Sequence, residues 1–169
     1  MSPFSAMSTV EGVVRHLVEH LAQVALVVAP PVLRIALALP FFKSGLTKWD
    51  SFLSLSPAAA YLFEDEFKLH IFGHAYDFPF PAVFAYFDAI AEIVLPALLI
   101  LGFATRFSAL ALLVMTGVIQ LVVPEGWANF HLPWAALAVA LMAIGPGKLS
   151  VDYLAASRYR APVSGGGRQ

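Results

Sequence analysis

The sequence predicts an all-α protein: a transmembrane four-helix bundle with an N-terminal amphipathic helix and a long extracytoplasmic loop between spans one and two. Sixty per cent of the 169 residues are hydrophobic and only 12% are charged, and the mean hydropathy is +0.79. Soluble domains are less apolar and more highly charged than this. The apolar residues also gather in runs near the length of about 20 residues that crosses a bilayer. Four such runs fit the chain.

The composition excludes several classes of function. The chain has no cysteine, which removes disulfides, thiolate nucleophiles, iron–sulfur clusters and cysteine-bound zinc. Redox chemistry would therefore need a bound cofactor, a metal held by histidine and carboxylate, or a partner protein. A net charge of −1 argues against nucleic-acid binding. No nucleophilic triad, phosphate loop or nucleotide fingerprint is visible, and the opening residues lack the basic start of a cleaved signal peptide.

Residues 1–30 are predicted to form an N-terminal segment with an amphipathic helix. Its polar residues recur at every fourth position while apolar residues take the other faces: Glu11, Arg15, Glu19 and Gln23 against Val14, Leu17, Val18 and Leu21. This periodicity is typical of an amphipathic helix. Two places for the helix stay open, the membrane surface and the side of the bundle. Pro30 and Pro31 are expected to redirect the chain after it.

The membrane domain is expected over residues 31–147. Its first span begins near Pro31, because proline suits the first turn of a helix, and runs through RIALALPFFKSGLTKW. Residues 50–80 then form a long connection with an acidic cluster and an aromatic, proline-rich segment. A connection of this length without an obvious span predicts a cap outside the membrane.

The other three spans are predicted at residues 81–103, 107–123 and about 132–144. A Gly-Pro-Gly sequence ends the last of them, since glycine stops helices and proline cannot continue them. Residues 148–169 form a polar tail that is expected to be cytoplasmic and, because of its SGGG stretch, disordered.

The basic residues predict the orientation. An even number of spans places both termini on one side of the membrane, and that side collects Arg15, Arg106, Lys148, Arg158, Arg160 and Arg168. The opposite side has only two basic residues, Lys48 and Lys68, with Lys43 deeper in the first span, and it collects the acidic residues Glu64, Asp65, Glu66, Asp77 and Glu125. The positive-inside rule then predicts a multi-pass protein of the bacterial inner (plasma) membrane with both termini in the cytoplasm.

Two carboxylates lie near the head of the second span, in YFDAIAEIVLPALLILGF. Asp88 and Glu92 are one helical turn apart and share a face. A charge at mid-bilayer costs about 2.5–3.5 kcal/mol on insertion scales, so it is expected to face the bundle interior and to have a partner. At about 1.5 Å per residue, Lys48 of the first span reaches the depth of Asp88. Glu92, Asp88 and Lys48 are therefore the predicted catalytic groups.

Other polar residues are expected near the same level. Gln120 on the third span and His131 before the fourth reach similar depths. Arg34 shares the helical stripe of Lys48, although it lies near the cytoplasmic boundary, where backbone or lipid phosphate is its expected contact. Arg34, Gln120 and His131 are the predicted substrate-binding residues. Lys43 points away from that stripe and is expected to extend toward the membrane surface.

Two segments resemble the DoxX family of small four-span membrane proteins. RIALALPFFKSGLTK has an Arg, Gly and Lys pattern similar to that of the family's first span. EIVLPALLILGFATRFSAL resembles the second family signature, in which an acidic residue precedes an aliphatic run, a glycine and a Thr-Arg turn, here Glu92, Gly102, Thr105 and Arg106. The resemblance covers roughly residues 34–117. The chain departs from it by Pro96, where the family often has glycine, by Asp88 and by its long N-terminus.

The resemblance implies a membrane protein linked to redox metabolism. Some members are described as the membrane subunit of a thiosulfate:quinone oxidoreductase, and others as membrane partners of oxidative-stress enzymes or neighbours of metal-stress genes. We therefore expect a quinone-interacting subunit, with quinone as the cofactor and with a protein partner on the extracytoplasmic face or in the membrane. Whether the chain is itself an enzyme, and whether it forms an oligomer, stay open.

Other interpretations stay open as well. The three charged residues could instead form a structural ion pair that pins two helices, in a non-catalytic membrane scaffold or a small-solute or metal-stress-related membrane protein. His70 and His74 have the spacing that gives half of a metal site on a helix, with Asp77 close behind. Gly73 and the prolines that follow argue against a helix there, and a bound metal is not expected.

Overall fold

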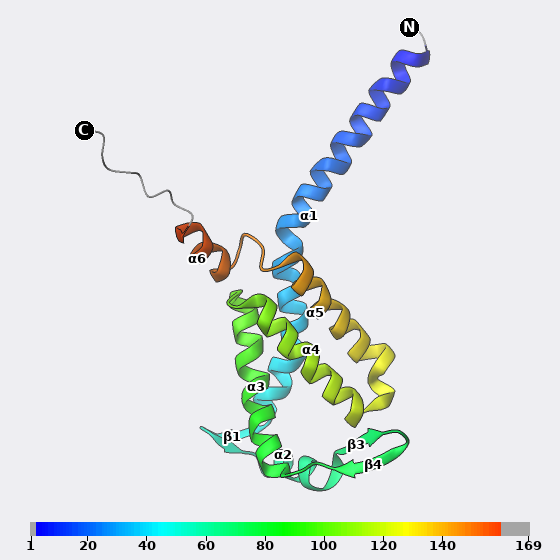
Figure 1. Ribbon diagram of the computed structural model, residues 1–169. Helices are drawn as coiled ribbons and strands as arrows, with labels where there is room; N and C mark the ends of the chain where they lie inside the picture. The colour runs from blue at the N-terminus through cyan, green and yellow to red at the C-terminus, as the bar shows by residue number, and fades with distance from the viewer. Residues whose placement is uncertain (1–2, 160–169) are drawn as a thin grey trace, which may run out of the picture.

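The computed structural model describes residues 3–159 and is mainly helical (Figure 1). Within this range, four helical segments are long and apolar enough to cross a membrane: Glu11–Thr47, Pro81–Leu101, Thr105–Val122 and Pro124–Ile144. They belong to α1 (Pro3–Thr47), α3 (Pro81–Leu101), α4 (Thr105–Val122) and α5 (Leu132–Ile144). Two short helical turns, η2 (Pro124–Gly126) and η3 (Trp127–His131), lead into α5. Each of the four predicted spans therefore corresponds to a helical segment that is a candidate membrane span.

The expected break at Pro30 and Pro31 is wrong, because α1 continues through both prolines for 45 residues. Its length is about 68 Å, against about 30 Å for the hydrocarbon core of a bilayer. Proline removes a backbone donor and crowds the preceding turn, but neighbouring segments make this tolerable in spanning helices. Here Pro30 is buried against Gly147, which has a positive φ of 75° and no Cβ to collide with the ring.

The N-terminal half of α1 leaves the bundle as a free-standing helix (Figure 1). Residues 11–28 are all exposed. The interpretation that this segment packs on the side of the bundle is therefore wrong. Since no turn separates it from the first span, the segment expected over residues 1–30 and the membrane domain share one helix.

The four spans pack in a closed ring in which α1 and α4 each contact both α3 and α5. The core between them contains large apolar side chains, namely Leu37, Phe41, Leu99, Leu112 and Leu141. Ala38, Ala109 and Ala138 lie in the same core, where small residues let helices approach closely.

The long connection after α1 is folded into a cap at the end of the bundle opposite α6 (Figure 1). Two antiparallel hairpins flank a short helical segment: β1 (Trp49–Ser51) with β2 (Ser54–Leu55), and β3 (Lys68–Ile71) with β4 (His74–Asp77). Between them lie α2 (Pro57–Tyr61) and the π-helical turn η1 (Leu62–Glu66). Phe63 and Phe78 of the cap pack with Ala85 of α3. The connection is thus held onto the bundle by its own aromatic core, and the protein has strands that the all-α prediction did not contain.

The predicted disordered tail begins instead with a docked helix, α6 (Val151–Tyr159). The Asp152 carboxylate accepts hydrogen bonds from the backbone N–H groups of Ala104, at 2.8 Å, and Thr105, at 2.9 Å. The expectation of disorder is therefore wrong for residues 151–159. The rest of the tail, including the SGGG stretch, lies outside the described residues.

Candidate functional site: an ion cluster in an apolar cavity

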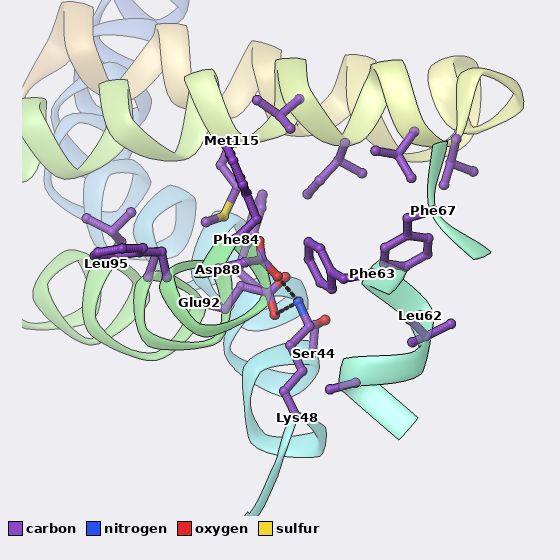
Figure 2. A pocket seen from close by; sticks show the side chains of 18 of the residues that line it. Ser44, Lys48, Leu62, Phe63, Phe67, Phe84, Asp88, Glu92, Leu95 and Met115 are labelled. Atoms are coloured by element: carbon purple, nitrogen blue, oxygen red, sulfur yellow. Dashed lines mark hydrogen bonds and ion pairs between the residues drawn. The ribbon is translucent and has the colours of Figure 1, made fainter. Parts of the chain in front are cut away.

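Lys48 joins the end of α1 to α3 through an ion cluster. It follows the last residue of α1, its N–H donates to the Gly45 carbonyl, and its own carbonyl accepts from Ser56 N–H at 2.9 Å. Held in this way, Lys48 Nζ contacts Asp88 Oδ2 and lies 2.7 Å from Glu92 Oε2 (Figure 2). The predicted partnership of these three side chains is confirmed. Lys43 is exposed, as its helical position predicts.

Gly45 allows the close approach that makes this cluster. A Cβ built on Gly45 would lie 2.9 Å from both the Cβ and the backbone carbon of Glu92. Real Cβ atoms do not come so near to another backbone, so any larger residue would force α1 and α3 apart. The glycine therefore sets the distance between the helix that ends at Lys48 and the helix that holds Glu92.

The cluster has more negative than positive charge. Glu92 is only 3% exposed, and one ammonium group faces two carboxylates. Although Glu92 Oε2 contacts Nζ, it accepts no hydrogen bond of good angle from any described residue. Ser44, one turn before Lys48, lies beside the same carboxylate. A buried acceptor with unused capacity favours binding of a proton or of a ligand that donates a hydrogen bond.

The cluster forms part of the wall of a cavity of about 700 Å³. Residues from α1, α3, α4 and the cap line this cavity, together with Trp134 of α5. Most of its lining is apolar and much of it aromatic, including Phe41, Phe63, Phe67 and Phe84. The Phe63 ring lies 5.7 Å from Lys48 Nζ, within the range of a cation–π contact. An apolar cavity of this size with a few polar groups at one wall is the usual form of a small-molecule site.

The lining of the cavity is exposed at the cap residues Ala58 and Leu62 and along α3 and α4. Its lining there includes Phe87 of α3 and Val114 and Val118 of α4, which are all exposed. These residues belong to helices that are long and apolar enough to cross a membrane. These exposed lining residues are therefore candidates for contact with lipid.

Gln120 and His131 form a separate pair that does not line the cavity. His131 Nδ1 donates to Gln120 Oε1 at 2.6 Å, and Gln120 Nε2 donates to the Pro124 carbonyl at 3.0 Å. The His131 ring packs on Gly126, where a Cβ would lie 2.6 Å from Cε1. The two side chains thus meet each other, as their similar depth predicts, but not the ion cluster. Trp134 lies between the two sites, with its ring 5.4 Å from that of His131.

Arg34 lies far from the cavity. It precedes Lys48 by 14 positions on α1, which is about 21 Å along a helix. Its buried guanidinium donates through Nη2 to the Leu149 carbonyl, while Nε and Nη1 have no hydrogen-bond partner among the described residues. The predicted contact with backbone is confirmed. Because Arg34 does not line the cavity, its predicted contact with substrate has no support from its position.

His70 and His74 lie in a hairpin and not on a helix. In the register of β3 and β4, His70 pairs with Ala75 and Ile71 pairs with His74. Since successive residues of a strand point to opposite faces, the two histidines are on opposite faces of the hairpin. His70 Nδ1 donates instead to the Leu121 carbonyl at 3.1 Å. In the part of the chain that the structure describes, no group of three histidine, aspartate or glutamate residues could hold a metal ion.

Sequence reasoning missed the cap side of the cavity. Ala59, Leu62, Phe63 and Phe67 line it, and all belong to a connection that was expected to lie outside the membrane. Their apolar character in a segment outside the spans is the signal that could have indicated a buried role. Ser44 was also missed, although it is four residues from Lys48 and therefore on the same helical face.

Comparison with known protein families supports the relationship that the motifs indicate. The DoxX family model matches residues 29–125, which is more than half of the chain. The matched range contains Gly45, Lys48, Asp88 and Glu92, and it leaves out the N-terminal half of α1, α5 and α6. Comparisons with curated proteins and with solved structures found no match.

Proposed function

Because the chain belongs to the DoxX family of membrane proteins, we propose that it is a quinone-interacting membrane component of a redox system. The observation that supports this most directly is the open apolar cavity with Lys48, Asp88 and Glu92 in its wall. A quinone has a ring with two carbonyl oxygens and an apolar isoprenoid tail. The charged side chains in the cavity wall can form hydrogen bonds with the ring oxygens, and the aromatic and aliphatic lining can pack against the isoprenoid tail.

The three charged side chains can serve the proton chemistry of a quinone. Reduction of a quinone to a quinol consumes two electrons and two protons. In the proposed site, Lys48 Nζ donates a hydrogen bond to a ring oxygen, and Glu92 and Asp88 pass protons to the ring oxygens as the electrons arrive. A chain without cysteine supplies no thiolate or iron–sulfur centre, so the electrons come from a partner redox protein. We place that partner on the extracytoplasmic face or in the membrane.

The proposed setting is the bacterial inner membrane, with both chain termini in the cytoplasm. The cap, at the opposite end of the bundle (Figure 1), then faces outward. The ion cluster joins α1 to α3 and faces Phe63 of the cap. In this proposal, protons and electrons reach it from the outer side while the quinone enters from the lipid.

Quinone retained by the purified protein tests the binding part of the proposal. Protein extracted from native membranes in mild detergent should contain close to one quinone per chain. Ala111 of α4 lines the cavity, and Ala111→Trp should lower the retained quinone at least tenfold. Ala136 of α5 is exposed and does not line the cavity, so Ala136→Trp should retain the wild-type amount. No quinone in the wild type, or equal amounts in both variants, would rule out this site.

The proton relay needs a separate test. Native membranes that contain the partner should form quinol more slowly when the chain has Glu92→Gln, while bound quinone remains. Wild-type turnover in that variant would remove the relay from the proposal and leave only the binding site.

A second candidate function is a non-catalytic membrane scaffold. The ion cluster supports this candidate, because the contacts of Lys48 with Asp88 and Glu92 hold the end of α1 against α3 and need no ligand. A double variant with Lys48→Met and Glu92→Leu distinguishes the scaffold from the quinone-interacting component. A scaffold should stay folded and still copurify with its partner, whereas a quinone component should lose its quinone and its activity.

A further inference from the structure

The N-terminal half of α1 has a continuous apolar stripe that no described part of the chain covers. Val14, Leu17, Leu21, Val24 and Val28 recur at alternating intervals of three and four residues, and all are exposed. At 100° per residue these five side chains fall within an arc of about 80°. Arg15 and Glu19 form an ion pair of 3.3 Å on the other side of the helix. Up to Gln23 the segment is therefore two-sided, with an apolar seam opposite a charged face, and residues 24–28 are apolar on every side.

The charges of this segment argue against a membrane surface as the cover for the seam. Helices that lie on bilayers have polar faces rich in lysine and arginine, which anionic lipids attract. Residues 11–29 contain two glutamates and one arginine. In addition, the segment continues the first span without a turn and points away from the bundle (Figure 1), whereas a surface helix must bend into the membrane plane.

The spacing of the seam fits a second helix of the same kind. An apolar repeat averaging 3.5 residues is the pattern of a left-handed coiled coil, with Val14, Leu21 and Val28 at one core position and Leu17 and Val24 at the other. Two copies of the chain inserted in the same membrane have the same orientation. Their α1 helices are therefore parallel and their repeats are in register at equal depth, and confinement to the membrane raises their effective concentration.

We propose that the chain forms a dimer in which residues 14–28 of α1 pair with the same residues of a second copy as a parallel two-stranded coiled coil. The Arg15–Glu19 pair stays on the outer surface of the dimer. The cavity and the ion cluster take no part in this contact. A test of the dimer is therefore independent of a test of the proposed function.

Disulfide crosslinking in native membranes tests the dimer, because a chain without cysteine has no background thiol. Leu17→Cys places a thiol in the seam, and Glu19→Cys places one on the charged face as the matched control. After mild oxidation, most of the Leu17→Cys protein should run as a dimer on a non-reducing gel, with at least a fivefold lower yield for Glu19→Cys. Similar yields at the two positions, or a monomer at Leu17→Cys, would overturn the proposal.

A second test places a charge in the apolar seam and measures the yield of the Leu17→Cys crosslink. Leu21→Glu added to Leu17→Cys should reduce the crosslink at least fivefold, whereas Gln23→Glu in the same background should leave it unchanged. Retention of the wild-type melting temperature shows that the bundle stays folded in both. Undiminished crosslinking with Leu21→Glu would also overturn the proposal.

Discussion

At the residue scale, the site depends on one glycine and one lysine. Gly45 removes the side chain that would separate α1 from α3, and Lys48, one turn later, meets both carboxylates. The two residues depend on each other. A lysine on a more distant helix could not reach Glu92, and a close helix without the lysine would leave the buried Glu92 and the half-buried Asp88 without a counter-ion.

Replacing Gly45 should destabilise the bundle. The new Cβ of Gly45→Ala meets the backbone of Glu92 at 2.9 Å, and overpacking of this kind costs about 1–3 kcal/mol. We expect a lower melting temperature in detergent. Gly117 has nothing within 4 Å of its added Cβ, so Gly117→Ala should be neutral or stabilise its helix by up to about 1 kcal/mol. Equal melting temperatures for the two variants would contradict the assigned role of Gly45.

Removing the lysine alone should be worse than removing the whole cluster. Lys48→Met leaves Asp88 and the buried Glu92 without their counter-ion, and breaking such a pair costs about 3–5 kcal/mol. Adding Asp88→Asn and Glu92→Gln removes the unpaired charges and should recover much of the loss. The exposed Lys43 provides the control, since Lys43→Met should change the free energy of unfolding by less than about 0.5 kcal/mol. Chemical or thermal unfolding of the wild type, Lys48→Met, the triple variant and Lys43→Met measures these differences. If the triple variant is no more stable than Lys48→Met, unpaired charge is not the cause of the lost stability.

At the element scale, α6 holds the turn between α3 and α4. Asp152 accepts from two N–H groups at the start of α4, and Arg34 donates to Leu149 just before α6. Gly102, with a positive φ of 68°, leaves the space that the Arg34 guanidinium fills. The end of the bundle opposite the cap is therefore closed by polar contacts, while the cap end is closed by aromatic packing.

Loss of the Asp152 carboxylate should loosen both α6 and the start of α4. Asp152→Ala leaves the N–H groups of Ala104 and Thr105 without acceptors, and loss of a helix-capping side chain costs about 0.5–2 kcal/mol. Hydrogen exchange should become faster at these two amides, and limited proteolysis should cut α6 earlier. Ser157 lies on the same helix, and among the described residues its side chain bonds only to the carbonyl of Leu154, so Ser157→Ala should leave both readouts unchanged. Unchanged exchange in Asp152→Ala would show that the turn holds without this contact.

At the scale of the whole molecule, the two ends of the bundle differ. One has the folded cap, and the other has α6 and the long N-terminal half of α1 (Figure 1). If the positive-inside rule holds, the first end faces outward and the second faces the cytoplasm.

Thiol labelling of intact cells tests this orientation. Glu64→Cys in the cap and Ser157→Cys in α6 are both exposed positions in a chain without other cysteines. A membrane-impermeant maleimide should label Glu64→Cys in intact cells and Ser157→Cys only after the membrane is permeabilised. The reverse pattern would invert the topology and place the electron donor in the cytoplasm.

The sequence by itself determined the four spans and the meeting of Lys48 with Asp88 and Glu92. Both follow from local rules. A span needs a certain length of apolar residues, and the depth and facing of a residue on a regular helix follow from a fixed rise and rotation per residue. A buried charge also needs a partner, which limits the arrangements that a short apolar chain can adopt.

Only the tertiary structure decided what depends on contacts between distant segments. Pro30 is buried within a continuous helix where Gly147, more than 100 positions away, has no Cβ to collide with its ring. The cap residues line the cavity because Phe63 and Phe78 pack against the start of α3, and His131 turns to Gln120 because Gly126 accommodates its ring. Periodicity describes each helix alone, whereas these outcomes depend on which side chains neighbouring segments present to one another.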